Sequence, residues 1–223
     1  GMIHPDMATM LGYLSCDVGI PVDVWQVMLK RVVDRSFNAM TVDGDTSTND
    51  SCLAFAAGEP LEQEHLQALE VGLLVAAQQL AKAIARDGEG ATCLLEVHVE
   101  GVTSDVEACC IARTVCGSSL VKTAVHGCDP NWGRIVAAAG RAGVPFDPAA
   151  VALWLGPHQL MEFGEPLPFD RIAASRYMQE RVDGSYLSDD TVRIRLVVGL
   201  SLIHISEPTR RTPLSYAVFC LQK

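Results

Sequence analysis

The sequence lacks any run of basic residues and any long apolar stretch free of polar breaks. Lysine and arginine total 17 against 27 aspartates and glutamates, which gives a net charge of −10 at neutral pH. An acidic chain without a basic patch argues against nucleic acids and anionic membranes as partners. The most apolar segment is interrupted by Gln78, Gln79 and Lys82, so we expect no membrane span.

Metal-ligand and disulfide signatures are also missing. No two of the eight cysteines have CxxC spacing, no HExxH motif occurs, and Cys109 is adjacent to Cys110 in a helical pattern. Cysteines scattered over a chain of this size favour reduced, packed thiols in a cytoplasmic protein. We therefore predict no metal site.

Helical and extended patterns alternate along the chain without a repeat or a low-complexity segment. With 223 residues and 49% apolar composition, the chain can bury one substantial core, and we expect one domain or most of one. Hydrophobic spacing predicts a helix from about Pro21 and further helices over residues 62–86, 105–116 and 131–141, with extended segments over residues 94–99, 152–155 and 191–198. This mixture predicts an α/β protein with helices covering β-sheets.

The chain opens with GMIHPDMATML, which places Thr9 directly after the small residue Ala8. A threonine hydroxyl is a weak nucleophile at neutral pH, and one solution is to use the residue's own α-amino group as general base. That amine exists only if the Ala8-Thr9 bond is cut, for example by attack of the Thr9 hydroxyl on the Ala8 carbonyl. Taken alone, the motif fits equally a strand or helix start in which Thr9 caps or packs.

Four segments together resemble the glutamate N-acetyltransferase / ornithine acetyltransferase family of arginine biosynthesis: GMIHPDMATML, RSFNAMTVDGDTSTNDS, RDGEGATCLLEV and SSLVKTAVHGCDPNWGRI. The resemblance runs from Gly1 to about Gly199. It implies a precursor that cleaves itself at Ala8-Thr9, so that residues 1–8 end the α chain and residues 9–199 belong to the β chain. The fold it implies is a layered α/β (α+β) sandwich similar to N-terminal-nucleophile enzymes, present here as an incomplete domain.

The resemblance also implies an activity. Thr9, as catalytic and substrate-binding residue, would take an acetyl group from N2-acetylornithine and pass it to L-glutamate through an acetyl-threonine intermediate. No bound cofactor is required, and acetyl-CoA would enter only as a substrate, since family members differ in accepting it. The missing α chain would supply oxyanion stabilisation and form an αβ heterodimer that oligomerises further.

Two alternatives remain open at this point. An N-terminal-nucleophile peptidase or amidase would resolve the acyl-enzyme with water instead of glutamate. A gene fragment without activity of its own would expose hydrophobic surface where the α chain and the final strand should pack.

The tail, residues 200–223, departs from the family pattern in mid-strand. Its sequence, LSLIHISEPTRRTPLSYAVFCLQK, looks like a translated sequencing adapter, with a native extension as the alternative. The tail holds three basic residues and one acidic residue, which leaves 14 basic and 26 acidic residues before it, a net charge of −12.

The segment VDGDTSTND concentrates turn formers after the strand-like FNAMTV. We expect Gly44 to turn the chain and a helix to begin near Asn49, capped by a hydroxyl side chain. The polar groups that would brace the catalytic threonine are those of Asp45, Asn49 and Asp50; an ordinary capped loop is the alternative.

Two further motifs carry candidate side chains. Glu89 lies between two glycines after the long helix, and the resemblance implies that it binds substrate, a role that would suit the ammonium group of an ornithine-like molecule. In DPNWGR, we expect Asp129 or Asn131 to cap a helix, Trp132 to be a buried anchor, and Arg134 to pair with Asp129 or bind a carboxylate.

Overall fold

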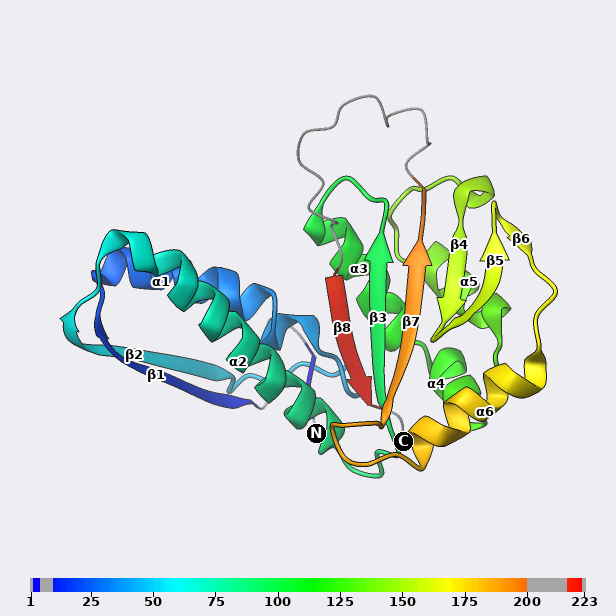
Figure 1. Ribbon diagram of the computed structural model, residues 1–223, viewed down its shortest axis with the longest axis horizontal. Helices are drawn as coiled ribbons and strands as arrows, with labels where there is room; N and C mark the ends of the chain where they lie inside the picture. The colour runs from blue at the N-terminus through cyan, green and yellow to red at the C-terminus, as the bar shows by residue number, and fades with distance from the viewer. Residues whose placement is uncertain (1, 5–9, 200–215, 222–223) are drawn as a thin grey trace. The chain divides into compact units, whose positions relative to one another are not determined.

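A computed structural model describes residues 2–4, 10–199 and, as backbone alone, 216–221 (Figure 1). Ala8 and Thr9 lie outside the described residues. The chain divides into two compact units, Gly1–Ala85 and Arg86–Lys223. That the chain forms one domain or most of one stays a prediction.

The first unit is a pair of parallel strands with two helices alongside (Figure 1). Strand β1 (Leu11–Gly19) leads through α1 (Val22–Asp34) and the 3-10 turn η1 (Phe37–Ala39) to β2 (Ser51–Pro60), which pairs with β1. A second 3-10 turn, η2 (Gln63–His65), opens the long helix α2 (Leu66–Arg86). Parallel strands need such a crossover, and here α1 provides it.

Contacts between side chains hold this unit together. Met28 of α1 is buried, and the Trp25 indole donates a hydrogen bond to the Ala54 carbonyl of β2 at 3.1 Å. Arg31 of α1 forms a two-pronged ion pair with Glu70 of α2, with N–O distances of 2.7 and 2.6 Å. Helix α1 is thereby fixed to both β2 and α2.

The helix expected near Asn49 is absent, because Ser51 already begins β2. The Ser51 amide donates to the Met10 carbonyl at 3.0 Å, and the pairing with β1 continues from there. Upstream, Phe37 to Ala39 form a 3-10 turn where a strand was predicted. At Ser51, pairing with a strand 40 residues away overrides the local turn and cap chemistry from which the helix was predicted.

The second unit is built on a six-stranded sheet with the order β6-β5-β4-β7-β3-β8. The strands are β3 (Leu94–Glu100), β4 (Ala152–Leu155), β5 (His158–Glu162), β6 (Glu165–Pro166), β7 (Thr191–Val197) and β8 (Tyr216–Leu221). Its helices are α3 (Asp105–Cys116), α4 (Ser119–His126), α5 (Trp132–Gly140) and α6 (Arg171–Val182), with a 3-10 turn η3 (Pro148–Ala150). Strand β3 runs parallel to β7, and the remaining pairs are antiparallel.

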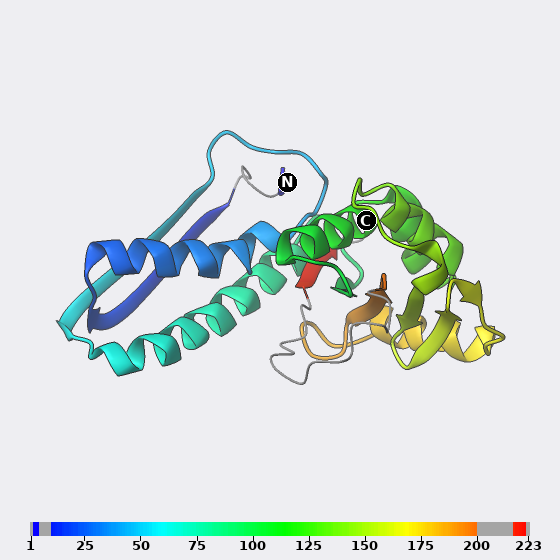
Figure 2. The same cartoon turned by 90° about the horizontal axis from the view of Figure 1, so that it is seen from above.

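Helices lie on both faces of this sheet: α3 and α5 on one face, and α6 on the other (Figures 1 and 2). Val97 of β3 and Ile194 of β7 are fully buried, while their neighbours along each strand include the charged residues Glu96 and Arg193 on the opposite face, as the two-residue period of a strand requires. The predicted α/β class with helices covering sheets is confirmed.

Strand β8 comes from the tail and pairs with the free edge of β3 in antiparallel register. Val97, for example, is opposite Val218. That residues 200–223 are a non-native tail stays a prediction.

One helix among the described residues, Gln63–Arg86, is long and apolar enough by length and composition to cross a membrane. That the chain has no membrane span stays a prediction, and Gln78, Gln79 and Lys82, which interrupt the apolar sequence, all lie within this helix. Helices α3 and α4 pass the same test as a bent pair. A helix of this kind is weak support for a membrane span, since core helices of other proteins meet the same criteria.

A buried ion pair joins three segments of the second unit. The Asp190 side chain is fully buried, and Arg86 donates to it through Nε. The same guanidinium donates to the carbonyls of Ala91 and Thr92, at 3.1 and 3.4 Å. Asp190 in turn accepts the Leu94 amide through its own carbonyl at 2.8 Å, so the pair links the end of α2 and the starts of β3 and β7.

We expect Arg86→Met to destabilise the full-length protein by about 3–5 kcal/mol, because it leaves the Asp190 carboxylate buried without its counter-charge. Urea unfolding followed by circular dichroism measures the effect. The double variant Arg86→Met with Asp190→Leu should recover most of the loss. The control, Lys30→Met, removes an ion pair whose side chains are 76% and 46% exposed, and should cost less than about 1 kcal/mol. Equal losses of unfolding free energy in Arg86→Met and Lys30→Met would contradict a special role for the buried ion pair of Arg86 and Asp190.

Candidate active site

The residue that follows Thr9 is held from two sides. The Met10 amide donates to Asp50 Oδ1 at 2.7 Å, and the Met10 carbonyl accepts the Ser51 amide at 3.0 Å. The Met10 side chain is buried. The entry of the chain into β1 is thus fixed against the start of β2.

Residues 2–4 are held by the same loop. Asp43 accepts the amides of Met2 and Ile3, at 2.6 and 3.1 Å, and the Ile3 carbonyl accepts the Val42 amide at 2.8 Å. His4 Nδ1 and Thr41 Oγ1 share a hydrogen bond of 2.9 Å. Residues 41–43 therefore anchor the chain before Ala8, as Asp50 anchors it after Thr9.

That the VDGDTSTND segment braces the catalytic threonine stays a prediction, because Thr9 lies outside the described residues. Asp50 acts on the backbone of Met10, whereas Thr48 donates to Asn49 inside the loop. The main anchor upstream, Asp43, was not predicted. Its place before Gly44, which has a φ of +82°, is typical of an aspartate turn and could have indicated it.

The Asp43 carboxylate is stabilised in its charged form. Partial burial acts to raise its pKa, but three amide donors, from Asp45, Met2 and Ile3, outweigh burial and hold the pKa below its ordinary value of 3.8. The carboxylate is therefore ionised at neutral pH, which is the state that accepts all three hydrogen bonds.

Glu89 lies in the second unit, in the exposed turn between α2 and β3. Gly90 next to it has a φ of +73°, a conformation that favours glycine. The following residues, Ala91 and Thr92, are tied to Arg86 as described above. Glu89 thus projects from a turn whose end is fixed, and its role in substrate binding stays a prediction.

The DPNWGR motif forms the start of α5. Asn131 is the N-cap, and its side-chain oxygen accepts the Arg134 amide at 3.2 Å, which confirms one of the two predicted caps. Asp129 pairs with Arg171 of α6 at 2.9 Å and accepts from the Asn131 side chain. Trp132 is half-buried, so the expected fully buried anchor was wrong.

Arg134 does not pair with Asp129. Its Nη1 donates to the Leu120 carbonyl at 3.0 Å and to Thr123 Oγ1 at 3.1 Å. Because Asp129 has Arg171 as its partner, Arg134 turns to α4 and ties that helix to α5. The motif acts here as a structural junction.

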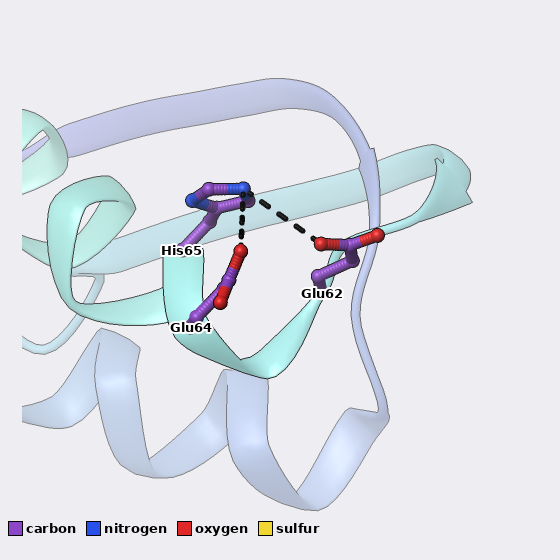
Figure 3. Close-up of side chains that lie close together, drawn as sticks. All are labelled: Glu62, Glu64 and His65. Carbon is purple, nitrogen blue, oxygen red and sulfur yellow. Dashed lines mark ion pairs between the residues drawn. The ribbon is translucent and has the colours of Figure 1, made fainter.

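Among the described residues, one group has the geometry to hold a metal ion: Glu62, Glu64 and His65, in and next to the turn η2 that precedes α2 (Figure 3). His65 Nε2 lies 3.9 Å from Glu62 and 3.6 Å from Glu64. All three side chains are exposed, and exposed carboxylates commonly gather without an ion. The absence of a metal site stays a prediction.

None of the seven cysteines with described side chains is in a disulfide, and Cys93, Cys109 and Cys116 are buried. That the thiols are reduced stays a prediction. Burial raises the pKa of the Cys93 thiol to about 11, which makes it a poor nucleophile at neutral pH.

Comparison with known proteins gives a match to the ArgJ family over residues 1–202. The chain is 92% identical over 199 residues to the arginine biosynthesis bifunctional protein ArgJ of Prochlorococcus marinus (strain MIT 9313), a match that covers 89% of this chain and 47% of the relative. It is 64% identical over 199 residues to the protein of the same name from Parasynechococcus marenigrum (strain WH8102), covering 89% and 46%. The chain thus spans about half the length of the curated relatives it matches.

A solved structure is also similar. The crystal structure of arginine biosynthesis bifunctional protein argJ from Bacillus halodurans matches with a TM-score of 0.84 and 33% sequence identity. The match covers 96% of this chain and 95% of that chain. The likeness therefore extends over both units.

The hydrogen bonds to Asp43 predict a pH dependence. Because the folded-state pKa is lowered, the stabilisation is complete above the unfolded value of about 3.9 and is lost as pH falls through the lower folded-state pKa. We expect the urea midpoint of the full-length protein to fall less between about pH 6 and pH 3 in Asp43→Asn than in the unchanged protein. Asp45→Asn is the control, because the Asp45 side chain makes no hydrogen bond within the described residues; a change equal to that of Asp43→Asn would contradict the assignment.

Proposed function

The chain belongs to the ArgJ family, and from this premise we propose that it is most of the β chain of a self-cleaving acetyltransferase of arginine biosynthesis. In this proposal Thr9 is the nucleophile, and the acetyl group passes from N2-acetylornithine to L-glutamate. The observation that carries the proposal is the family match over residues 1–202, a range that includes Ala8 and Thr9 in the GMIHPDMATML motif.

The proposed chemistry has two stages. In the first, the Thr9 hydroxyl attacks the Ala8 carbonyl, and the C–N bond between Ala8 and Thr9 breaks to give an ester and a free α-amino group on Thr9. Water then hydrolyses the ester, which leaves a carboxylate on Ala8 and restores the Thr9 hydroxyl. In the second, this amine accepts the hydroxyl proton as Thr9 attacks the acetyl carbonyl of N2-acetylornithine. Ornithine leaves with a proton, and the amine of glutamate then attacks the acetyl-threonine ester to give N-acetylglutamate and restore Thr9.

The anchors on either side of Ala8 and Thr9 in the sequence support this proposal. A nucleophile gains most when it is held close to its target in a productive orientation. Asp50 fixes the amide of Met10, one residue after Thr9, and Asp43 fixes residues 2 and 3 on the other side. After cleavage each new chain end would stay attached to the 41–50 loop.

We also propose that this chain needs a partner, the α chain. Strands β1 and β2 form a two-stranded parallel sheet. Such a sheet is only marginally stable unless further strands pair with it and other elements pack on its faces. One face of the pair carries large apolar side chains that are 47–66% exposed: Leu11, Tyr13, Leu53 and Phe55. An exposed apolar face of this kind marks a surface for a protein partner. In this proposal the partner is the α chain, which corresponds to the part of the relatives that this chain does not match.

The assembled enzyme in this proposal is an αβ heterodimer that oligomerises further and works in the cytoplasm without a bound cofactor. Acetyl-CoA would act only as an alternative acetyl donor. The isolated 223 residues would be inactive, because oxyanion stabilisation would come from the α chain. The peptidase or amidase alternative differs in that water, and not glutamate, would accept the acyl group.

Cleavage provides the first test. The full-length reading frame with native Thr9 should yield two fragments divided at Ala8-Thr9, measured by intact mass, and Thr9→Ala should yield one unbroken chain. Thr46→Ala is a matched control, because Thr46 is an exposed threonine of the bracing loop and makes no hydrogen bond within the described residues. An unbroken product from the folded native protein would contradict the N-terminal-threonine mechanism.

Substrate recognition provides the second test. Glu89→Gln should raise the KM for N2-acetylornithine about tenfold or more with a smaller effect on kcat, because a charge-assisted contact to an ammonium group is lost. Acetyl transfer to glutamate is the assay, and its dependence on glutamate separates the transferase from an amidase. Asp87→Asn, in the same exposed turn, is the control; an unchanged KM in Glu89→Gln would remove Glu89 from the site.

A further inference from the structure

The second unit contains a groove of about 800 Å³ between α6 and the face of the sheet that α3 and α5 leave uncovered. Strands β3 and β7 form its floor, the turn from β4 to β5 forms one end, and α6 forms a wall. Four arginines line it: Arg176, Arg181, Arg193 and Arg195. A groove of this volume is in the range that takes a small metabolite.

Two of the arginines are fixed to the floor. Arg193 Nε donates to Glu96 at 3.1 Å, and the Glu96 side chain is only 6% exposed. Arg195 binds Glu100 through two parallel hydrogen bonds of 2.8 and 2.9 Å and lies 4.6 Å from the centre of the Trp154 ring. These contacts hold the guanidiniums in place, and since each guanidinium has five N–H donors, some are left for a ligand.

The other two arginines come from α6. Arg181 lies 5.1 Å from the centre of the Tyr177 ring and donates to the Asp189 carbonyl at 3.5 Å. Arg176 is exposed and makes no ion pair or hydrogen bond within the described residues. Tyr177 itself is buried and accepts the Arg193 amide, so the wall is fixed to the floor.

The charge of the groove is opposite to that of the chain. Its lining has four arginines against two glutamates, Glu100 and Glu180, and the arginines still outnumber the carboxylates if Glu96 is counted. The chain as a whole has a net charge of −10. A hollow that gathers positive charge in an acidic protein concentrates the electrostatic field and attracts anions.

We propose that this groove binds a small molecule through an oxyanion group, a carboxylate or a phosphate. Arg176 and Arg181 of α6 would donate hydrogen bonds to the anion, because a planar guanidinium can bind either a carboxylate or a phosphate through two parallel hydrogen bonds. Arg193 and Arg195 would form a fixed positive floor beneath it, and His98 and His158 add ring nitrogens to the lining. The proposal does not depend on acetyl transfer.

Calorimetric titration of the full-length protein tests the proposal, with inorganic phosphate and citrate as separate probes at constant ionic strength. We expect saturable binding of at least one probe at one site per chain. Arg176→Gln alone should weaken it severalfold, and the double variant with Arg181→Gln at least tenfold. Arg141→Gln is the matched control, because Arg141 is an exposed arginine of the same unit at the end of α5. Its affinity should equal that of the unchanged protein.

The comparison of probes identifies the ligand class: tighter phosphate binding supports a phosphorylated metabolite, and tighter citrate binding supports a polycarboxylate. Absence of saturable binding with both probes would overturn the proposal. Equal weakening in Arg141→Gln and in the double variant would also overturn it, because the binding would then follow net charge and not the groove. A circular dichroism spectrum and melting temperature for each unliganded variant separate loss of binding from loss of fold.

Discussion

The charge of Asp190 imposes the strongest constraint on the second unit. A carboxylate removed from water needs a counter-charge, and the partner is Arg86, at the end of a 21-residue helix. The pairing determines more than its own two residues. Because Arg86 also binds the carbonyls of Ala91 and Thr92, the turn that carries Glu89 is tied to the starts of β3 and β7. A local requirement for charge compensation thereby fixes the turn of residues 86–92 against the starts of two strands in the second unit.

The same chemistry acts at the start of the chain, with backbone amides in place of a guanidinium. Asp43 and Asp50 belong to one loop, and each accepts amide hydrogen bonds from residues about 40 positions earlier. The short aspartate side chain suits this role because it carries charge on a stem with few rotatable bonds. Both proposed ends of the processed chain are therefore held by one element, and the candidate site and the fold share their supports.

Helix positions were predictable because periodicity and capping are local. The spacing of apolar residues indicated α2 and α3, and the Asn131 cap followed from one residue type at a helix start. The predictions were wrong where the local structure or the ion-pair partner of a residue depends on a segment distant in the sequence. Ser51 begins a strand because β1 is beside it, and Asp129 pairs with Arg171, 42 residues away, and not with nearby Arg134. The family resemblance indicated Thr9 and Glu89 from short motifs, whereas Asp43 acts through backbone amides, which leave no residue-type signal.

The contact between Met10 and Asp50 also bears on the order of folding and the proposed cleavage. Its two residues are separated by the whole of β1, α1 and the 41–50 loop, so the contact forms only after a long loop has closed. An unfolded or half-folded chain cannot position the Ala8-Thr9 bond through this contact. The proposed cleavage at Ala8-Thr9 would then depend on folding. Only a folded molecule would gain the free α-amino group of Thr9, and misfolded molecules would stay uncleaved and inactive.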